Sequence, residues 1–182
     1  MRYLSFAALL TVCATALAIP PVPRKAPEFT LVQAPGQQTL LSSYKGKVVF
    51  IMFMSTTCPH CQRLAQEVTK LDGEFKGKGF QPLGVAFNPE ANALTVKEFI
   101  KQFNVSFPIS YSPVDSVLSY LGVSVMERYV YPEVMIIDRK GVIRAQSPAT
   151  GDANLQDPNY LRNMISGLLK EPAGGAAKKT GI

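Results

Sequence analysis

Two cysteines separated by two residues are the groups in this sequence best suited to chemistry. The chain contains three cysteines and one histidine, and that histidine, His60, lies between Cys58 and Cys61. A disulfide between such close residues closes a short loop, so it restricts the unfolded chain little and stabilises the fold little. The spacing therefore favours a pair that is oxidised and reduced over a purely structural bridge.

The residues around the pair predict where the two sulfurs lie. The run Val48–Met54 is continuously apolar and rich in β-branched and aromatic residues, which is typical of a strand covered on both faces. After the cysteines, apolar residues recur with helical spacing, and Pro59 fits the first turn of a helix. Cys58 is therefore expected where a helix begins, and free backbone N–H groups and the helix dipole stabilise a negative sulfur there.

This placement gives the two cysteines different expected roles. A thiolate attacks a disulfide, so we expect Cys58 to attack and Cys61, one turn further along, to resolve. Pro59 and His60 are expected to tune the redox potential. The alternative that His60 faces solvent and has no electrostatic role stays open. Two cysteines and one histidine leave a tetrahedral metal site one ligand short, so we expect no metal and no cofactor.

The remaining pattern alternates strands and helices. A second apolar strand is expected at 80–87, a short one at 109–111, and a hairpin at 134–145 that turns at Asp138 to Gly141. Three further helices are expected. One begins at a capping box formed by Thr95 and Glu98, one runs from Pro113 to Gly122, and the last is capped by Asp157 and begins at Pro158. Such an order predicts an α/β sheet covered on both faces.

The N-terminus predicts export. Residues 1–18 contain one basic residue, an apolar run at 3–12 and the small residues Ala16 and Ala18, which together read as a cleavable signal peptide. The run is shorter than the roughly 20 residues that cross a bilayer. Two alternatives remain: the segment stays uncleaved as a membrane anchor, or Cys13 is lipidated, although Val12 before it is larger than the small residue usual at that place. Membrane association is expected only through one of these two.

We expect three further segments after the signal. Residues 19–27 form a proline-rich extended leader, 28–170 form one domain, and 171–182 form a disordered tail without periodicity. The net charge is +6, but the basic residues are scattered without interleaved aromatic residues. We therefore interpret them as solvated surface charge and expect no nucleic-acid partner.

The chain from residue 26 to residue 169 resembles the TlpA/ResA-like branch of thioredoxin-fold proteins. The resemblance depends on the apolar strand before Cys58-Pro59-His60-Cys61, on the segment 105–109, and on a proline followed by an Ile-Ile-Asp strand and a glycine turn. It implies a thioredoxin-like fold, with a central mixed sheet flanked by helices on both faces and an inserted strand-helix segment. It also implies that Pro132 is a cis-proline opposite the dithiol and that the Tyr131 backbone binds substrate.

Several positions depart from that family pattern. Thr57 replaces the usual aromatic residue, Leu64 replaces a frequent acidic residue, and Met52 stands where ordinary thioredoxins have a buried acid. The proline that commonly kinks the following helix is also absent. Glu67 is then the carboxylate expected to approach Cys61. These departures bear on the direction of electron flow, whereas dithiol chemistry does not depend on them.

The resemblance implies an exported, periplasmic or extracytoplasmic thiol-disulfide oxidoreductase that serves cell redox homeostasis. Its partners would be exported protein thiols or disulfides, with reduction as the usual direction and a membrane-embedded thiol reductase as electron donor. The Pro-His dipeptide instead resembles oxidising members of the family.

Two other classes remain open. A thiol peroxidase with antioxidant activity would carry proline at Ile51 and threonine at Ser55 in its P-x-x-x-T-x-x-C pattern, and neither is present. A non-catalytic binding module would keep a stable disulfide and hold a partner in the groove beside Tyr131.

Overall fold

The computed structural model describes residues 19–173 of the chain. The predicted signal peptide, 1–18, and most of the predicted tail, 174–182, lie outside the described residues. Within residues 19–173, no helix combines the length and the apolar character that crossing a bilayer requires.

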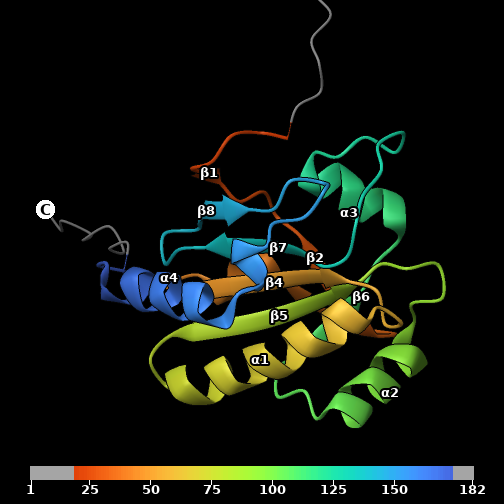
Figure 1. Ribbon diagram of the computed structural model, residues 1–182, viewed down its shortest axis with the longest axis horizontal. Coiled ribbons are helices and arrows are strands. Elements are labelled where there is room, and N and C mark those ends of the chain that lie inside the picture. Colours follow the sequence, from red (N-terminus) through yellow and green to blue (C-terminus); the bar gives the residue numbers. More distant parts are fainter. Residues whose placement is uncertain (1–18, 174–182) are drawn as a thin grey trace, which may run out of the picture.

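One mixed sheet of eight strands forms the centre of the structure, in the order β1-β8-β7-β4-β5-β6-β2-β3 (Figure 1). β4 and β5 are parallel, as are β5 and β6, whereas β7 runs antiparallel to β4. The strands are β1 Arg24–Lys25, β2 Thr30–Ala34, β3 Gln37–Leu40, β4 Val48–Met54, β5 Phe80–Ala86, β6 Ile109–Tyr111, β7 Glu133–Ile137 and β8 Val142–Gln146. The expected hairpin is therefore β7 and β8, and the expected α/β class with a central mixed sheet is confirmed.

Helices cover both faces of this sheet. The residues of α1 (Pro59–Phe75), α2 (Ala93–Phe103) and α4 (Pro158–Lys170) share one hydrophobic cluster, and those of α3 (Val114–Leu121) belong to another. Two short 3-10 helices, Leu41–Tyr44 and Asn154–Gln156, complete the elements of the described chain.

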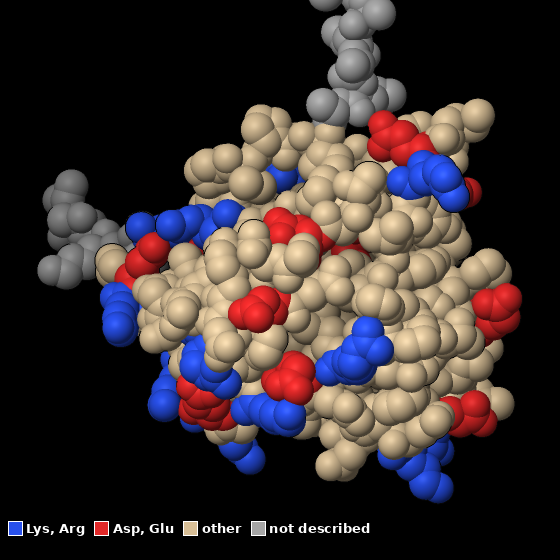
Figure 2. Space-filling model, viewed as in Figure 1, with Lys and Arg blue, Asp and Glu red and all other residues tan. Residues whose placement is uncertain are grey.

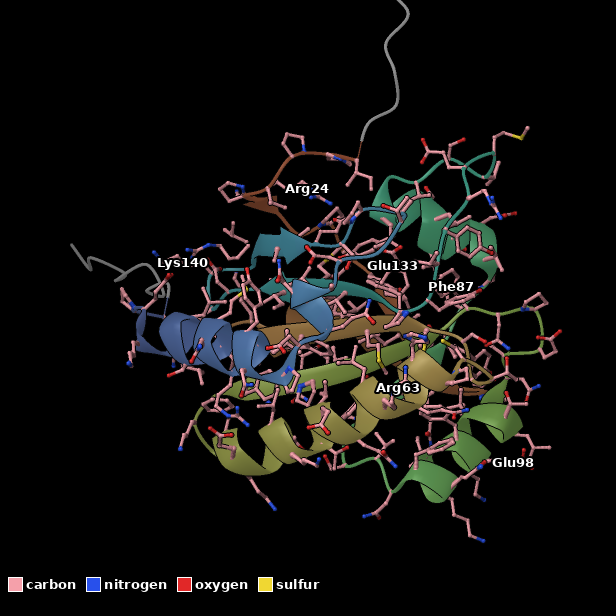
Figure 3. All side chains as sticks on the ribbon, viewed as in Figure 1. Arg24, Arg63, Phe87, Glu98, Glu133 and Lys140 are labelled. Carbon is pink, nitrogen blue, oxygen red and sulfur yellow. The ribbon has the colours of Figure 1, made fainter. Side chains whose placement is uncertain are left out.

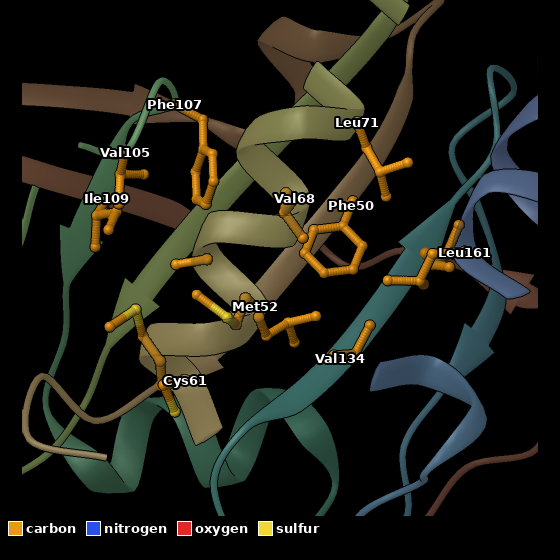
Figure 4. Packing of buried hydrophobic residues seen from close by; sticks show 14 of the residues in the cluster. Phe50, Met52, Cys61, Val68, Leu71, Val105, Phe107, Ile109, Val134 and Leu161 are labelled. Carbon is orange, nitrogen blue, oxygen red and sulfur yellow. The ribbon is translucent and has the colours of Figure 1, made fainter. Parts of the chain in front are cut away.

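The side chains of β4 alternate between the two clusters. Phe50, Met52 and Met54 belong to the cluster of α1, and Figure 4 shows Phe50 and Met52 packed against that helix. Val49, Ile51 and Phe53 belong to the cluster of α3. Every residue of β4 is buried, which explains why its sequence is continuously apolar rather than alternating.

The start of α2 differs from the expectation. The helix begins at Ala93, because the Asn92 side chain accepts the N–H groups of Leu94 and Thr95 and so forms the N-cap. Thr95, expected to be the cap, instead accepts the Asn92 N–H with its hydroxyl oxygen. The Thr95 and Glu98 pattern therefore predicted this helix correctly but assigned its N-cap to the wrong residue.

The leader also carries more structure than its composition indicated. Arg24 and Lys25 form β1 and pair antiparallel with β8 at one edge of the sheet. At the other edge, β2 and β3 form a hairpin beside β6 that the sequence pattern did not reveal. Both pairings join segments whose own apolar periodicity is weak.

Two glycines provide a matched test of this packing. A Cβ at Gly84 in β5 would lie 2.8 Å from Cγ1 of Ile109 in β6, whereas a Cβ at Gly73 in α1 would contact nothing within 4 Å. Gly84→Ala is expected to lower the free energy of unfolding by about 1–3 kcal/mol through overpacking. Gly73→Ala is expected to raise it by about 0.5–1 kcal/mol, because alanine favours helix interiors. Urea denaturation measures both, and equal effects of the two variants would contradict this close approach.

Candidate redox-active site

Cys58 lies at the point where the buried strand β4 passes into helix α1. It is the N-cap residue of α1, and Pro59 occupies the first turn, where its lack of an N–H costs nothing. The Cys58 Sγ accepts the backbone N–H of Cys61 at 3.4 Å. One of the otherwise free N–H groups of the helix start is thus aimed at sulfur, in the position expected from the sequence.

A cis-proline lies directly before strand β7, next to the residue that contacts this sulfur. The peptide bond between Tyr131 and Pro132 is cis, as expected from the family pattern. The Cys58 thiol donates to the Tyr131 carbonyl oxygen with an Sγ to O distance of 3.7 Å. The Tyr131 ring packs on Phe87 with ring centroids 4.8 Å apart, and this contact holds the segment that carries the carbonyl.

The two sulfurs occupy different environments. Both cysteines are free thiols, Cys58 partly exposed and Cys61 buried in the cluster beneath α1. Burial, reinforced by the hydrogen bond to Cys58, raises the pKa of the Cys61 thiol far above its usual range. Cys61 is therefore a protonated thiol at neutral pH, and Cys58 is the sulfur that an incoming molecule can reach.

The carboxylate expected near Cys61 is not supplied by Glu67. Its Oε1 pairs with Nζ of Lys70 at 2.7 Å on the exposed side of α1. Met52 and Leu64, noted above as departures from the family pattern, are both buried in the apolar cluster that contains Cys61. His60 is exposed on the first turn of α1.

Sequence reasoning missed Glu133, the residue directly after the cis-proline. Its side chain is only 2% exposed, and its Oε1 has no hydrogen-bond partner. Burial raises the pKa of Glu133 to about 8, so its carboxyl group is protonated at neutral pH. Glu133 lies opposite Phe53 across the β7–β4 pairing, on the face of the sheet that α3 covers, and Figure 3 labels its side chain. The sequence feature that could have indicated Glu133 is a single acidic residue at the start of the apolar run of β7.

Sequence reasoning also missed Asn88, which follows strand β5. Its Oδ1 accepts the backbone N–H of Thr56 at 3.1 Å, and its Nδ2 donates to Glu90 at 3.1 Å. Asn88 is buried, so these bonds satisfy an amide that would otherwise be costly to bury. The bond to Thr56 fixes the loop that delivers Cys58 to the start of α1.

The described residues 19–173 contain no group of three or more His, Cys, Asp or Glu side chains that could hold a metal ion. Cys58, Cys61 and His60 thus do not form part of such a group.

The fold and the position of the two cysteines at the start of α1 identify the class of protein. The structure is a thioredoxin-like fold: it superposes on a putative thiol:disulfide interchange protein DsbE from Chlorobium tepidum with a TM-score of 0.65 and 26% identity, covering 81% of this chain and 96% of that one. A putative protein disulfide isomerase from Bacteroides thetaiotaomicron shares the fold, with a TM-score of 0.68 at 24% identity over 85% of this chain and 93% of that one.

The chain belongs to the Redoxin family, whose model matches residues 21–163. It is 32% identical over 119 residues to the thiol-disulfide oxidoreductase ResA of Geobacillus kaustophilus, covering 65% of this chain and 64% of the relative. The ResA of Bacillus thuringiensis subsp. konkukian is 27% identical over 120 residues, covering 66% of this chain and 65% of that relative. The chain thus spans slightly less than two thirds of the length of these relatives.

The different environments of the sulfurs predict selective alkylation. When the reduced protein is treated briefly with iodoacetamide at neutral pH, Cys58 is expected to be modified and Cys61 to be spared, because alkylation requires an accessible thiolate. Peptide mass spectrometry locates the label, and unfolding in urea serves as the control in which both cysteines react. Labelling of Cys61 before Cys58 in the folded protein would contradict the arrangement.

Glu133 predicts a dependence of stability on pH. Its pKa is about 8 in the folded chain against an ordinary value of 4.5, so between these values only the unfolded chain releases the proton. The contribution of Glu133 to the free energy of unfolding is therefore complete below pH 4.5 and is lost as the pH rises toward 8, by at most about 1.4 kcal/mol per pH unit.

The variant Glu133→Gln isolates this effect, because other titrating groups remain in both proteins. Urea denaturation between pH 5 and pH 8 is expected to show the wild type losing stability relative to the variant as the pH rises. Parallel stability curves for the two proteins would show that Glu133 is ionised in the folded chain.

Proposed function

We propose that this chain is a thiol-disulfide oxidoreductase in which Cys58 attacks a disulfide of a partner protein and Cys61 resolves the product. The observation that carries the proposal is the unequal placement of the two sulfurs. The partly exposed Cys58 Sγ accepts a helix N-terminal N–H, and the buried Cys61 thiol lies one turn behind it. The names of the ResA relatives agree with this activity.

The proposed reaction proceeds in two exchanges. The Cys58 thiolate attacks one sulfur of the partner disulfide, so a mixed disulfide forms and the other partner sulfur leaves as a thiolate that takes a proton from water. Cys61 then gives its proton to the solvent and attacks the Cys58 Sγ, and the second partner sulfur leaves as a thiolate that takes a proton from water. The partner gains two electrons, and Cys58 and Cys61 end as a disulfide.

The surroundings of Cys58 support binding of an extended partner chain. The Tyr131 carbonyl already contacts the Cys58 Sγ, so this stretch of backbone lies beside the reactive sulfur. We propose that Tyr131 forms backbone hydrogen bonds to the partner beside its cysteine. Pro59 and His60, at the exposed start of α1, are proposed to tune the redox potential, because groups that stabilise the Cys58 thiolate favour the reduced form.

The proposed setting is extracytoplasmic and the proposed direction is reduction. Export rests on the signal-like pattern of residues 1–18, and the direction rests on the resemblance to exported reductases. Each cycle leaves Cys58 and Cys61 oxidised, so a reductant must regenerate the pair. A membrane-embedded thiol reductase fits this requirement outside the cytoplasm.

Two serine variants test the proposal. With insulin as the protein disulfide, Cys58→Ser is expected to lower the rate of reduction by about 10³-fold or more, because the accessible nucleophile is lost. Cys61→Ser is expected to accumulate a mixed disulfide on Cys58, which non-reducing electrophoresis and mass spectrometry detect. An adduct on Cys61 in the Cys58→Ser protein would overturn the roles. Turnover of hydrogen peroxide that survives Cys61→Ser would instead indicate a thiol peroxidase.

A further inference from the structure

Exposed apolar side chains concentrate in one segment of the described chain, residues 124–131, named here the 124–131 loop. Val125 is 64% exposed, Met126 is 89% exposed and Val130 is 43% exposed. The loop joins α3 to β7, and Figure 1 shows it projecting beyond α3. Single exposed apolar residues are ordinary on protein surfaces, but a cluster in one short loop indicates a binding surface.

The local hydrogen bonds hold the apolar tip of the loop outward. The Ser124 hydroxyl accepts the N–H of Met126 at 3.2 Å, and the Ser124 carbonyl accepts the N–H of Glu127 at 2.9 Å. These bonds close a tight turn with Val125 and Met126 at its corners. A loop ordered in this way loses little conformational entropy when it binds a partner.

The other end of the loop is anchored at the dithiol. The Val130 N–H donates to the Ala149 carbonyl at 3.0 Å, and the Tyr129 and Tyr131 rings contact each other edge to face with centroids 5.7 Å apart. The Tyr131 carbonyl accepts from the Cys58 thiol. One continuous ordered segment therefore leads from the exposed apolar tip to the reactive sulfur.

The length of the segment places its tip within the area that a partner protein covers. Met126 and Tyr131 are five residues apart, so at about 3.6 Å per residue their Cα atoms lie within about 18 Å of each other. A standard protein interface covers about 800 Å² on each partner, which as a disc has a radius of about 16 Å. A disc of that size is about 32 Å across, so one partner whose disulfide reaches Cys58 is large enough to cover Val125 and Met126 as well.

The chemistry of the tip indicates what part of the partner it contacts. The methionine side chain is flexible and polarisable, so it adapts to apolar surfaces of different shapes. Glu127 and Arg128 follow with opposite charges, and charges of both signs are interspersed over the face seen in Figure 2. Net charge therefore does not distinguish the tip from the rest of this face, whereas its exposed apolar side chains do.

We propose that the 124–131 loop binds an apolar polypeptide segment that flanks the target disulfide, with Val125 and Met126 as the contact residues. This inference rests on the proposed oxidoreductase function and adds the class of substrate that the enzyme prefers: protein disulfides flanked by apolar residues, as in partners that are not yet folded.

The test compares three proteins on three disulfides. The proteins are the wild type, the double variant Val125→Ser with Met126→Ser, and Leu94→Ser, which changes an equally exposed apolar residue (63% exposed) on α2. The substrates are hydroxyethyl disulfide and two peptides with the same internal disulfide, one flanked on both sides by several leucine and valine residues and the other by serine and glycine.

The double variant is expected to raise KM for the apolar peptide by about fivefold or more through lost apolar burial. All three proteins are expected to reduce hydroxyethyl disulfide at equal rates, which shows that the dithiol and the fold are intact, and Leu94→Ser is expected to match the wild type throughout.

An unchanged KM for the apolar peptide in the double variant would overturn the inference, as would an equal preference of the wild type for both peptides. A wild-type dimer that the double variant dissociates in sedimentation would also overturn it, because the loop would then bind a second copy of the chain. A wild type inactive on all three disulfides would instead refute the proposed function, and with it this inference.

Discussion

The hydrogen bond from the Cys61 N–H to the Cys58 Sγ is the interaction on which the site depends, because it places a sulfur at the open start of a helix. The surrounding structure keeps the sulfur there. Strand β4, buried on both faces, fixes the direction of the chain that enters α1. Asn88 accepts the Thr56 N–H in the intervening loop, and the Tyr131 carbonyl, directly before Pro132, accepts from the Cys58 thiol.

The same geometry makes the two thiols unequal. One helical turn carries Cys61 from the exposed end of α1 into the apolar cluster, where burial raises the pKa of its thiol. Met52 and Leu64 keep the surroundings of Cys61 apolar, and Glu67 is paired with Lys70. The buried acid beside the cis-proline is instead Glu133, which burial keeps protonated at neutral pH.

The sequence predicted the parts of this structure that local patterns encode. The apolar run of β4, the Cys58-x-x-Cys61 spacing with Pro59, and the hairpin of β7 and β8 each have such a signature. The cis bond at Pro132 was expected from the resemblance alone. Three features were not predicted, because each depends on residues distant in the sequence. Asn88 bonds to Thr56, and the edge strand β1 pairs with β8. Glu133 is buried in the apolar surroundings of β7.

A redox titration of the folded protein tests most directly whether Cys58 and Cys61 form a working couple. The protein is equilibrated in glutathione or dithiothreitol buffers, its free thiols are blocked, and the oxidised fraction is measured by mass. Both thiols are expected to oxidise together in one reversible two-electron step, with a potential between about −270 mV, as in thioredoxin, and about −120 mV, as in DsbA. Failure to form the intramolecular disulfide would contradict the proposal that Cys58 and Cys61 form a working redox couple. A potential below about −300 mV, as in structural disulfides, would contradict it as well.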